Sequence, residues 1–164
     1  MRYAAYGSNL HPLRLAKRVP SARFVAATAI PGWSLEFHKR GRDGSGKCNI
    51  VAAEQSVLFA LFDIDTNERP ILDATEGLIL GYEEMTIDAG DFGRCFCYVA
   101  SATHIDDKLK PFSWYRELVI AGLEHHQAPT EYLQRVRSIE HIPDDDEARY
   151  RENMAIVAEA RKSS

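Results

Sequence analysis

The first hundred residues consist mainly of short apolar segments bounded by turn residues, a pattern typical of strands. Residues 2–6 form the first segment, which stops at a Gly-Ser-Asn turn. A Pro-Gly pair at 31–32 and a glycine-rich stretch at 41–46 interrupt later segments, and the second of these predicts a flexible loop. The further predicted strands cover residues 23–30, 33–38, 49–53, 57–64, 82–87 and 94–100, the last two forming a hairpin around residues 89–91.

The pattern changes to a helical period in the final third. Tyr115, Leu118, Val119 and Gly122 are spaced i, i+3, i+4, i+7 and predict a helix over residues 114–126, with Ser113 as its cap. Helices are also predicted over residues 130–139 and 144–160, the latter opened by the three acids at 144–146. Shorter helices are predicted over residues 11–18, with Asn9 as a possible cap, and over residues 66–75, with Gly77 at the stop. Strands before residue 101 and helices after residue 113 indicate the α+β class, with a small mixed β-barrel or curled sheet.

Length and composition indicate one folded domain over residues 1–164. The chain is 45% hydrophobic and 27% charged, which excludes intrinsic disorder. A domain of this size buries enough surface to need no disulfide or metal. Cys48, Cys95 and Cys97 lack zinc-ligand spacing, and we expect them to be buried free thiols in a reducing compartment.

The net charge of −4 hides an asymmetry along the chain. Residues 1–50 hold nine Lys and Arg against two acids, whereas the remainder holds eleven against 22. The cationic first third indicates either an anionic partner or a solvated basic loop. A nucleic-acid role for Lys39, Arg40, Arg42 and Lys47 is disfavoured because no aromatic residues interleave with them. With no leader-like or membrane-length apolar run, we expect a cytoplasmic protein without a membrane partner.

The segment Tyr3-Ala4-Ala5-Tyr6-Gly7-Ser8-Asn9-Leu10 is the first candidate site. A strand that enters a helix through Gly-Ser-Asn exposes several backbone N–H groups in one concavity, which suits a carboxylate or phosphate. An ordinary strand–turn–helix connection requires the same residues, so both interpretations stand at this point.

Glu76 is the second candidate, at the end of a short predicted helix and just before Gly77. The negative end of the helix dipole favours the protonated form of a carboxyl group in this position. A carboxyl group that exchanges a proton near neutral pH can act as a general acid and base. A surface glutamate without a catalytic role is the alternative.

Taken together, these motifs resemble the γ-glutamylcyclotransferase family. The resemblance rests on Tyr-x-x-Tyr-Gly-Ser-Asn-Leu from Tyr3, Asp-x-x-Glu-Gly from Asp73, and Pro-Phe-Ser-x-Tyr from Pro111. The Ala-Pro-x-x-Tyr element from Ala128 looks like the family's Leu-Pro-x-x-Tyr. The resemblance spans residue 3 to about residue 139.

The resemblance implies a β-barrel flanked by helices, with a substrate cavity at one mouth. It implies a cofactor-free and metal-free enzyme that cyclises γ-glutamyl amino acids or peptides to 5-oxoproline, with Glu76 as catalytic acid and base. The implied substrate-binding residues are Tyr3, Ala4, Ala5, Tyr6, Gly7, Ser8, Asn9, Tyr82 and Tyr115. The implied partner is a small anionic γ-glutamyl compound rather than nucleic acid or membrane, and a homodimer is left open.

The chain also departs from the family pattern. With Asn9, the first motif resembles that of the family's general branch, which cleaves γ-glutamyl amino acids. The glutathione-specific branch usually has Tyr-Gly-Ser-Leu at this point. Ala4 replaces a commonly bulkier residue, and residues 46–49 replace an expected glycine-rich run. These departures leave open a relative that acts on γ-glutamyl amines, and a non-catalytic ligand-binding module of the same fold.

Overall fold

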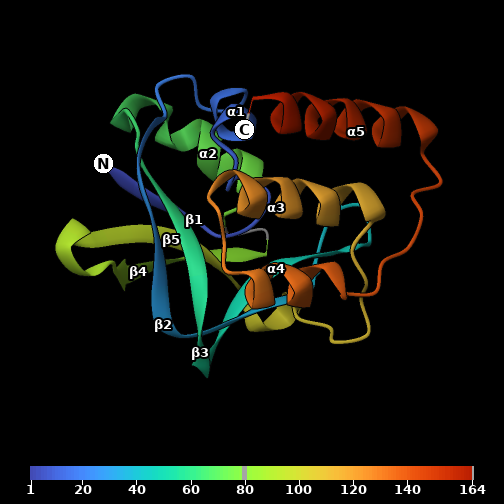
Figure 1. The fold of residues 1–164 in the computed structure, drawn as a ribbon, viewed down its shortest axis with the longest axis horizontal. Helices are drawn as coiled ribbons and strands as arrows, with labels where there is room; N and C mark the ends of the chain where they lie inside the picture. The colour runs from blue at the N-terminus through green and yellow to red at the C-terminus, as the bar shows by residue number, and fades with distance from the viewer. Residues whose placement is uncertain (79–80, 164) are drawn as a thin grey trace.

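The computed structural model describes residues 1–78 and 81–163 and consists of a mixed sheet covered by helices (Figure 1). Helix α3 lies between α4 and α5 and contacts both. The strands are β1 (Arg2–Ala5), β2 (Arg23–Arg40), β3 (Gly46–Asp63), β4 (Tyr82–Asp88) and β5 (Arg94–Ala100). The α-helices are α1 (Pro12–Ala16), α2 (Arg69–Glu76), α3 (Ser113–His125), α4 (Thr130–Arg137) and α5 (Glu147–Lys162), and short 3-10 turns are η1 (Thr66–Glu68), η2 (Gly90–Phe92) and η3 (Ala102–His104).

The five strands follow the order β2-β3-β1-β5-β4. The short strand β1 lies in the middle, antiparallel to β3 and parallel to β5, where Tyr3 is opposite Phe96. The predicted α+β class with a mixed sheet is confirmed. Closure into a barrel is not seen in the ladders that join the described residues, although β2 and β3 bend strongly along their length (Figure 1).

Two pairs of short predicted strands are in fact single long strands. The segments 23–30 and 33–38 belong to β2, and the segments 49–53 and 57–64 belong largely to β3. The ladder shifts register between Pro31 and Trp33, so the Pro-Gly pair marks an irregularity within the ladder rather than a strand end. β2 lies at the edge of the sheet, where a proline without an N–H group is tolerated.

The helix starts differ in detail from the prediction. His11, not Asn9, caps α1, because its ring nitrogen Nδ1 accepts from the backbone N–H of Leu13 at 3.2 Å. Phe112 holds the cap position of α3, and Ser113 is the first helical residue. Asp146 caps α5 as expected from the acids before it. Asn9 is thereby left available for another role.

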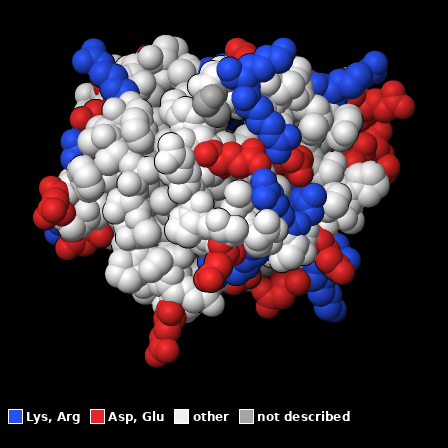
Figure 2. Space-filling model, in the orientation of Figure 1, with Lys and Arg blue, Asp and Glu red and all other residues white. Residues whose placement is uncertain are grey.

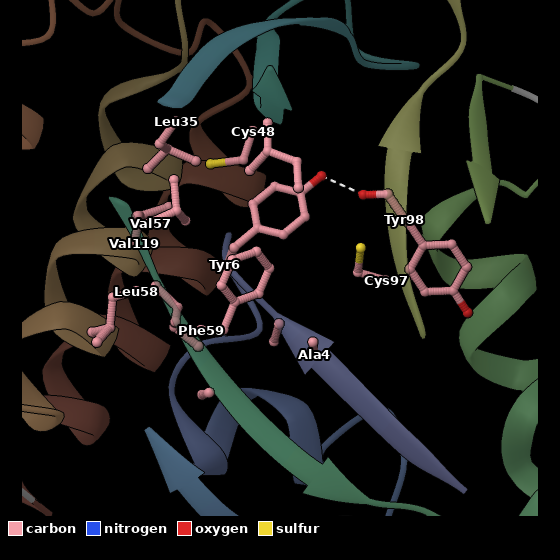
Figure 3. Close-up of a cluster of buried hydrophobic side chains, with 14 of the residues drawn as sticks. Ala4, Tyr6, Leu35, Cys48, Val57, Leu58, Phe59, Cys97, Tyr98 and Val119 are labelled. Atoms are coloured by element: carbon pink, nitrogen blue, oxygen red, sulfur yellow. Dashed lines mark hydrogen bonds between the residues drawn. The ribbon is translucent and has the colours of Figure 1, made fainter. Parts of the chain in front are cut away.

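The hydrophobic core contains side chains from β1, from α3 and from the long hairpin β2–β3. Figure 3 shows Tyr6 between Cys48, Phe59 and Cys97, with its hydroxyl donating to the carbonyl oxygen of Tyr98. The three cysteines are free and buried, as predicted. None of the helices in the described residues is long and apolar enough to cross a membrane.

Candidate active site

A small cavity of about 20 Å³ opens where β1 runs into the turn that precedes α1. The turn, the end of α2, the start of β3 and the first turns of α3 all contribute to it. We call it the inner cavity. Its lining residues are Tyr3, Tyr6, Gly7, Ser8, Asn9, Cys48, Glu76, Tyr82, Tyr98 and Tyr115.

The turn after β1 presents its backbone to the inner cavity. It is closed by a hydrogen bond from the N–H of Leu10 to the carbonyl oxygen of Gly7 at 3.0 Å. The N–H groups of Ser8 and Asn9 have no acceptor within the described part of the chain. A Cβ atom on Gly7 would lie 3.0 Å from the Cβ of Cys48, so a larger residue would crowd this wall. The turn can therefore offer amide donors to an anionic group.

Glu76 is the last residue of α2, which ends at Gly77 as predicted. Its Oε1 accepts from Asn9 Nδ2 at 2.8 Å and from Arg18 Nη1 at 3.1 Å. Arg18 also donates to Asn9 Oδ1 at 2.9 Å, so the three side chains form a closed set. Both donors orient the carboxyl group of Glu76, which lies beside the turn.

Tyr115 reaches the cavity from α3. Its hydroxyl oxygen accepts from the backbone N–H of Cys48 at 3.1 Å, and its hydroxyl also interacts with the Cys48 thiol, a weak partner that a ligand oxygen can replace. Burial raises the pKa of Tyr115 well above its ordinary value, so the hydroxyl stays protonated at neutral pH. The hydroxyl of Tyr82 instead donates to the carbonyl oxygen of Cys48 at 2.7 Å. The pKa of the Cys48 thiol is raised by burial to about 12, which leaves it unsuited to be a nucleophile.

A second, larger hollow of about 220 Å³ continues from the first, and we call it the outer cavity. Ser8, Glu76, Tyr82 and Tyr115 line both, so Glu76 lies at their junction. Charged side chains gather over the helices on one face of the molecule, whereas the sheet side is mostly uncharged (Figure 2). The other residues that line the outer cavity are Arg18, Lys39, Gly41, Arg42, Asp43, Lys47, Thr75 and Gly77.

The structure brings most of the predicted site residues together. The inner cavity is lined by all of them except Ala4 and Ala5, which are fully buried in the core of the sheet between β3 and β5. Arg18, Cys48 and Tyr98 were not predicted as part of the site. Tyr98 lies two positions after Phe96 on the same face of β5, and this alternation is only a weak sequence signal for a site residue. Arg18 and Cys48 reach the site through long-range packing, which no local pattern predicts.

The described residues hold no group of three or more His, Cys, Asp or Glu side chains that could bind a metal ion. What the site can do chemically is proton transfer at Glu76, combined with anion or oxyanion binding by the turn amides and the Tyr115 hydroxyl. These functions are supplied by the chain's own residues.

Comparisons with known proteins relate the sequence and the fold to proteins already described. No family model matches the chain. A gamma-glutamylcyclotransferase from Bos taurus is 25% identical over 147 residues, covering 84% of this chain and 78% of that protein. A solved structure described as gamma-glutamyl cyclotransferase superposes with a TM-score of 0.81 at 21% identity, covering 97% of this chain and 98% of the other. An uncharacterized protein from Homo sapiens superposes with a TM-score of 0.79 at 22% identity, covering 96% and 97%. In sequence and in fold over nearly the whole domain, the chain is therefore similar to gamma-glutamylcyclotransferases.

Proposed function

We propose that this protein is itself an active γ-glutamylcyclotransferase, which converts γ-glutamyl amino acids or peptides to 5-oxoproline and a free amino acid or peptide. The observation that carries the proposal is that the Glu76 carboxylate and the amides of the Gly7–Ser8 turn line one cavity. This similarity alone does not establish the reaction, because identity to the bovine relative is 25%. The chemistry of the site supports it independently.

The reaction needs one base that later acts as an acid. Glu76 removes a proton from the α-ammonium group of the γ-glutamyl residue, and the resulting amine attacks the γ-carbonyl carbon. The new C–N bond closes a five-membered lactam while the old amide C–N bond breaks. Glu76 returns its proton to the departing nitrogen, and the second proton, shed by the ring nitrogen, completes the ammonium group of the released product.

Binding supplies much of the rate enhancement, since nucleophile and electrophile belong to one molecule. The cavity has only to hold the γ-glutamyl chain folded, with the amine against the carbonyl carbon. The unpaired N–H groups of Ser8 and Asn9 and the O–H of Tyr115 are donors for the α-carboxylate or the developing oxyanion. Asn9 and Arg18 hold Glu76 in place, which is an arrangement that a binding module without turnover would not need.

The proposal is tested by incubating the purified protein with γ-glutamylalanine and measuring 5-oxoproline and alanine by mass spectrometry. Equimolar release of the two products supports the proposed reaction. A panel with glutathione, γ-glutamyl-lysine and a γ-glutamyl amine then ranks the leaving groups. Binding of these compounds without release of 5-oxoproline would identify the protein as a non-catalytic member of the family.

A further inference from the structure

Lys39, near the end of β2, is a buried cation that forms no ion pair with the described part of the chain. Its side chain lines the outer cavity, yet the residue is only 5% exposed. Its Nζ lies 4.3 Å from the ring centroid of Tyr82, and no hydrogen-bond acceptor is recorded for it within residues 1–78 and 81–163. Burial lowers the pKa of Lys39, and the charges of Glu76 and Asp43 offset only part of that effect. A charge held in this way is poised for an anion from outside the chain.

The neighbouring cations differ from Lys39 in their partners. Lys47 Nζ donates to Asp43 at 2.7 Å and to Ser45 at 2.7 Å, and Arg18 is paired with Glu76. Arg42 is exposed at the rim, and no ion pair of it is recorded among the described residues. The outer cavity therefore holds two positive charges, one buried and one exposed, that the described chain does not neutralise.

The position of Glu76 indicates how a substrate lies along the two cavities. Glu76 must reach both the α-amine and the departing nitrogen, and it lies where the inner and outer cavities meet. The γ-glutamyl residue then occupies the inner cavity, and the leaving group extends outward past Tyr82. That path leads to Lys39, whose Nζ lies over the Tyr82 ring.

We propose that Lys39, assisted by Arg42, binds the free carboxylate of the leaving amino acid or peptide, an inference that rests on the proposed function. The protein is then selective for γ-glutamyl compounds whose leaving group carries a carboxylate, and it discriminates against γ-glutamyl amines. Lys39 is a specificity-determining residue in this account and takes no part in proton transfer. A charge-assisted bond in a partly buried site corresponds to a preference of roughly 10- to 100-fold.

The test compares γ-glutamylalanine with γ-glutamylalaninamide, which differ only in the charge at the far end. We expect wild-type kcat/KM to favour the acid by roughly 10- to 100-fold. Lys39→Met should bring this ratio close to one, and Lys39→Arg should restore most of it. Arg40→Gln is the matched control, because Arg40 follows Lys39 in the chain, pairs with Asp106 at 3.1 Å and does not line the cavity. In Arg40→Gln, the ratio of kcat/KM for the acid to kcat/KM for the amide should stay at the wild-type value.

An equal loss for both compounds in Lys39→Met, with the ratio unchanged, would overturn the inference, since Lys39 would then hold the γ-glutamyl residue itself. Calorimetric binding of both compounds to Glu76→Gln separates this question from turnover. Lys39-dependent preference for the acid, without any release of 5-oxoproline by the wild type, would retain the carboxylate site and reject the proposed reaction. Equal binding of acid and amide would reject the carboxylate site even if the wild type were active.

Discussion

Asn9 Nδ2 donates to Glu76 Oε1 at 2.8 Å, although the two residues are 67 positions apart in the chain. This bond joins the turn after β1 to the end of α2, the two motifs on which the functional proposal depends. Asn9 is 3% exposed, and its amide oxygen accepts from Arg18, so its orientation is determined from both ends. We regard Asn9 as a positioning residue for the carboxylate.

Asn9→Leu should therefore lower kcat much more than it changes KM. The leucine removes one of the two donors to Glu76 and the acceptor for Arg18, and we expect a loss of roughly 10- to 100-fold in kcat. Steady-state kinetics with γ-glutamylalanine measures this split. Asn153→Leu is the control, because Asn153 is also buried but donates to the backbone of α5. A normal kcat for Asn9→Leu would contradict the positioning role.

Gly122→Ala should destabilise the protein even though alanine favours a helix. A Cβ at position 122 would lie 2.4 Å from the Cβ of Leu10 and 3.0 Å from the backbone nitrogen of His11. Overpacking of this kind costs about 1–3 kcal/mol, which exceeds the helix gain of about 1 kcal/mol. We expect a lower Tm in thermal unfolding, together with reduced activity because Leu10 closes the active-site turn. A raised Tm would contradict this prediction, because it would show that α3 and the turn can move apart without loss of stability.

Stability should fall as the pH drops from about 6.5 towards 4. Burial, with a contribution from His125 and His126, lowers the pKa of His11 from 6.5 to about 4. The unfolded chain therefore binds more protons in this window, which favours unfolding as the pH falls. After allowance for solvent screening, we expect a loss of about 1–2 kcal/mol.

Thermal unfolding of His11→Asn at about pH 7 and pH 4.5 tests this assignment. Asparagine keeps a side-chain cap for α1 but does not titrate. The acid-induced loss should shrink without vanishing, because burial also lowers the pKa of His126. A variant with the same acid-induced loss as the wild type would exclude His11 as the source.

Local signals in the sequence predict the strand–turn segment at residues 2–9 and the helix that ends at Gly77. Both depend on residues close together in the chain, and both are confirmed. Pro31 was wrongly predicted to end a strand, because its tolerance depends on β2 being at a sheet edge. Edge position is a tertiary property that the local pattern does not contain.

The same division between local signals and tertiary contacts applies to the candidate site. Tyr3, Tyr6 and Glu76 belong to short motifs and were predicted, whereas Arg18 and Cys48 join the site only through contacts between distant segments. The charge count indicated a cationic first third, but it does not say which cations are paired. Lys47 and Lys39 are eight positions apart on neighbouring strands, and only the structure shows that the first has a carboxylate partner.

In the proposed reaction, Glu76 transfers the proton between the attacking and departing nitrogens. Glu76→Gln keeps the size and an acceptor for Asn9 but cannot exchange the proton, so kcat for 5-oxoproline release should fall at least ~100-fold. Glu83→Gln, an exposed site on β4, is the matched control and should retain wild-type kcat. Single-turnover release of 5-oxoproline from γ-glutamylalanine measures the chemical step directly. A Glu76→Gln variant that forms 5-oxoproline at the wild-type rate would contradict the account.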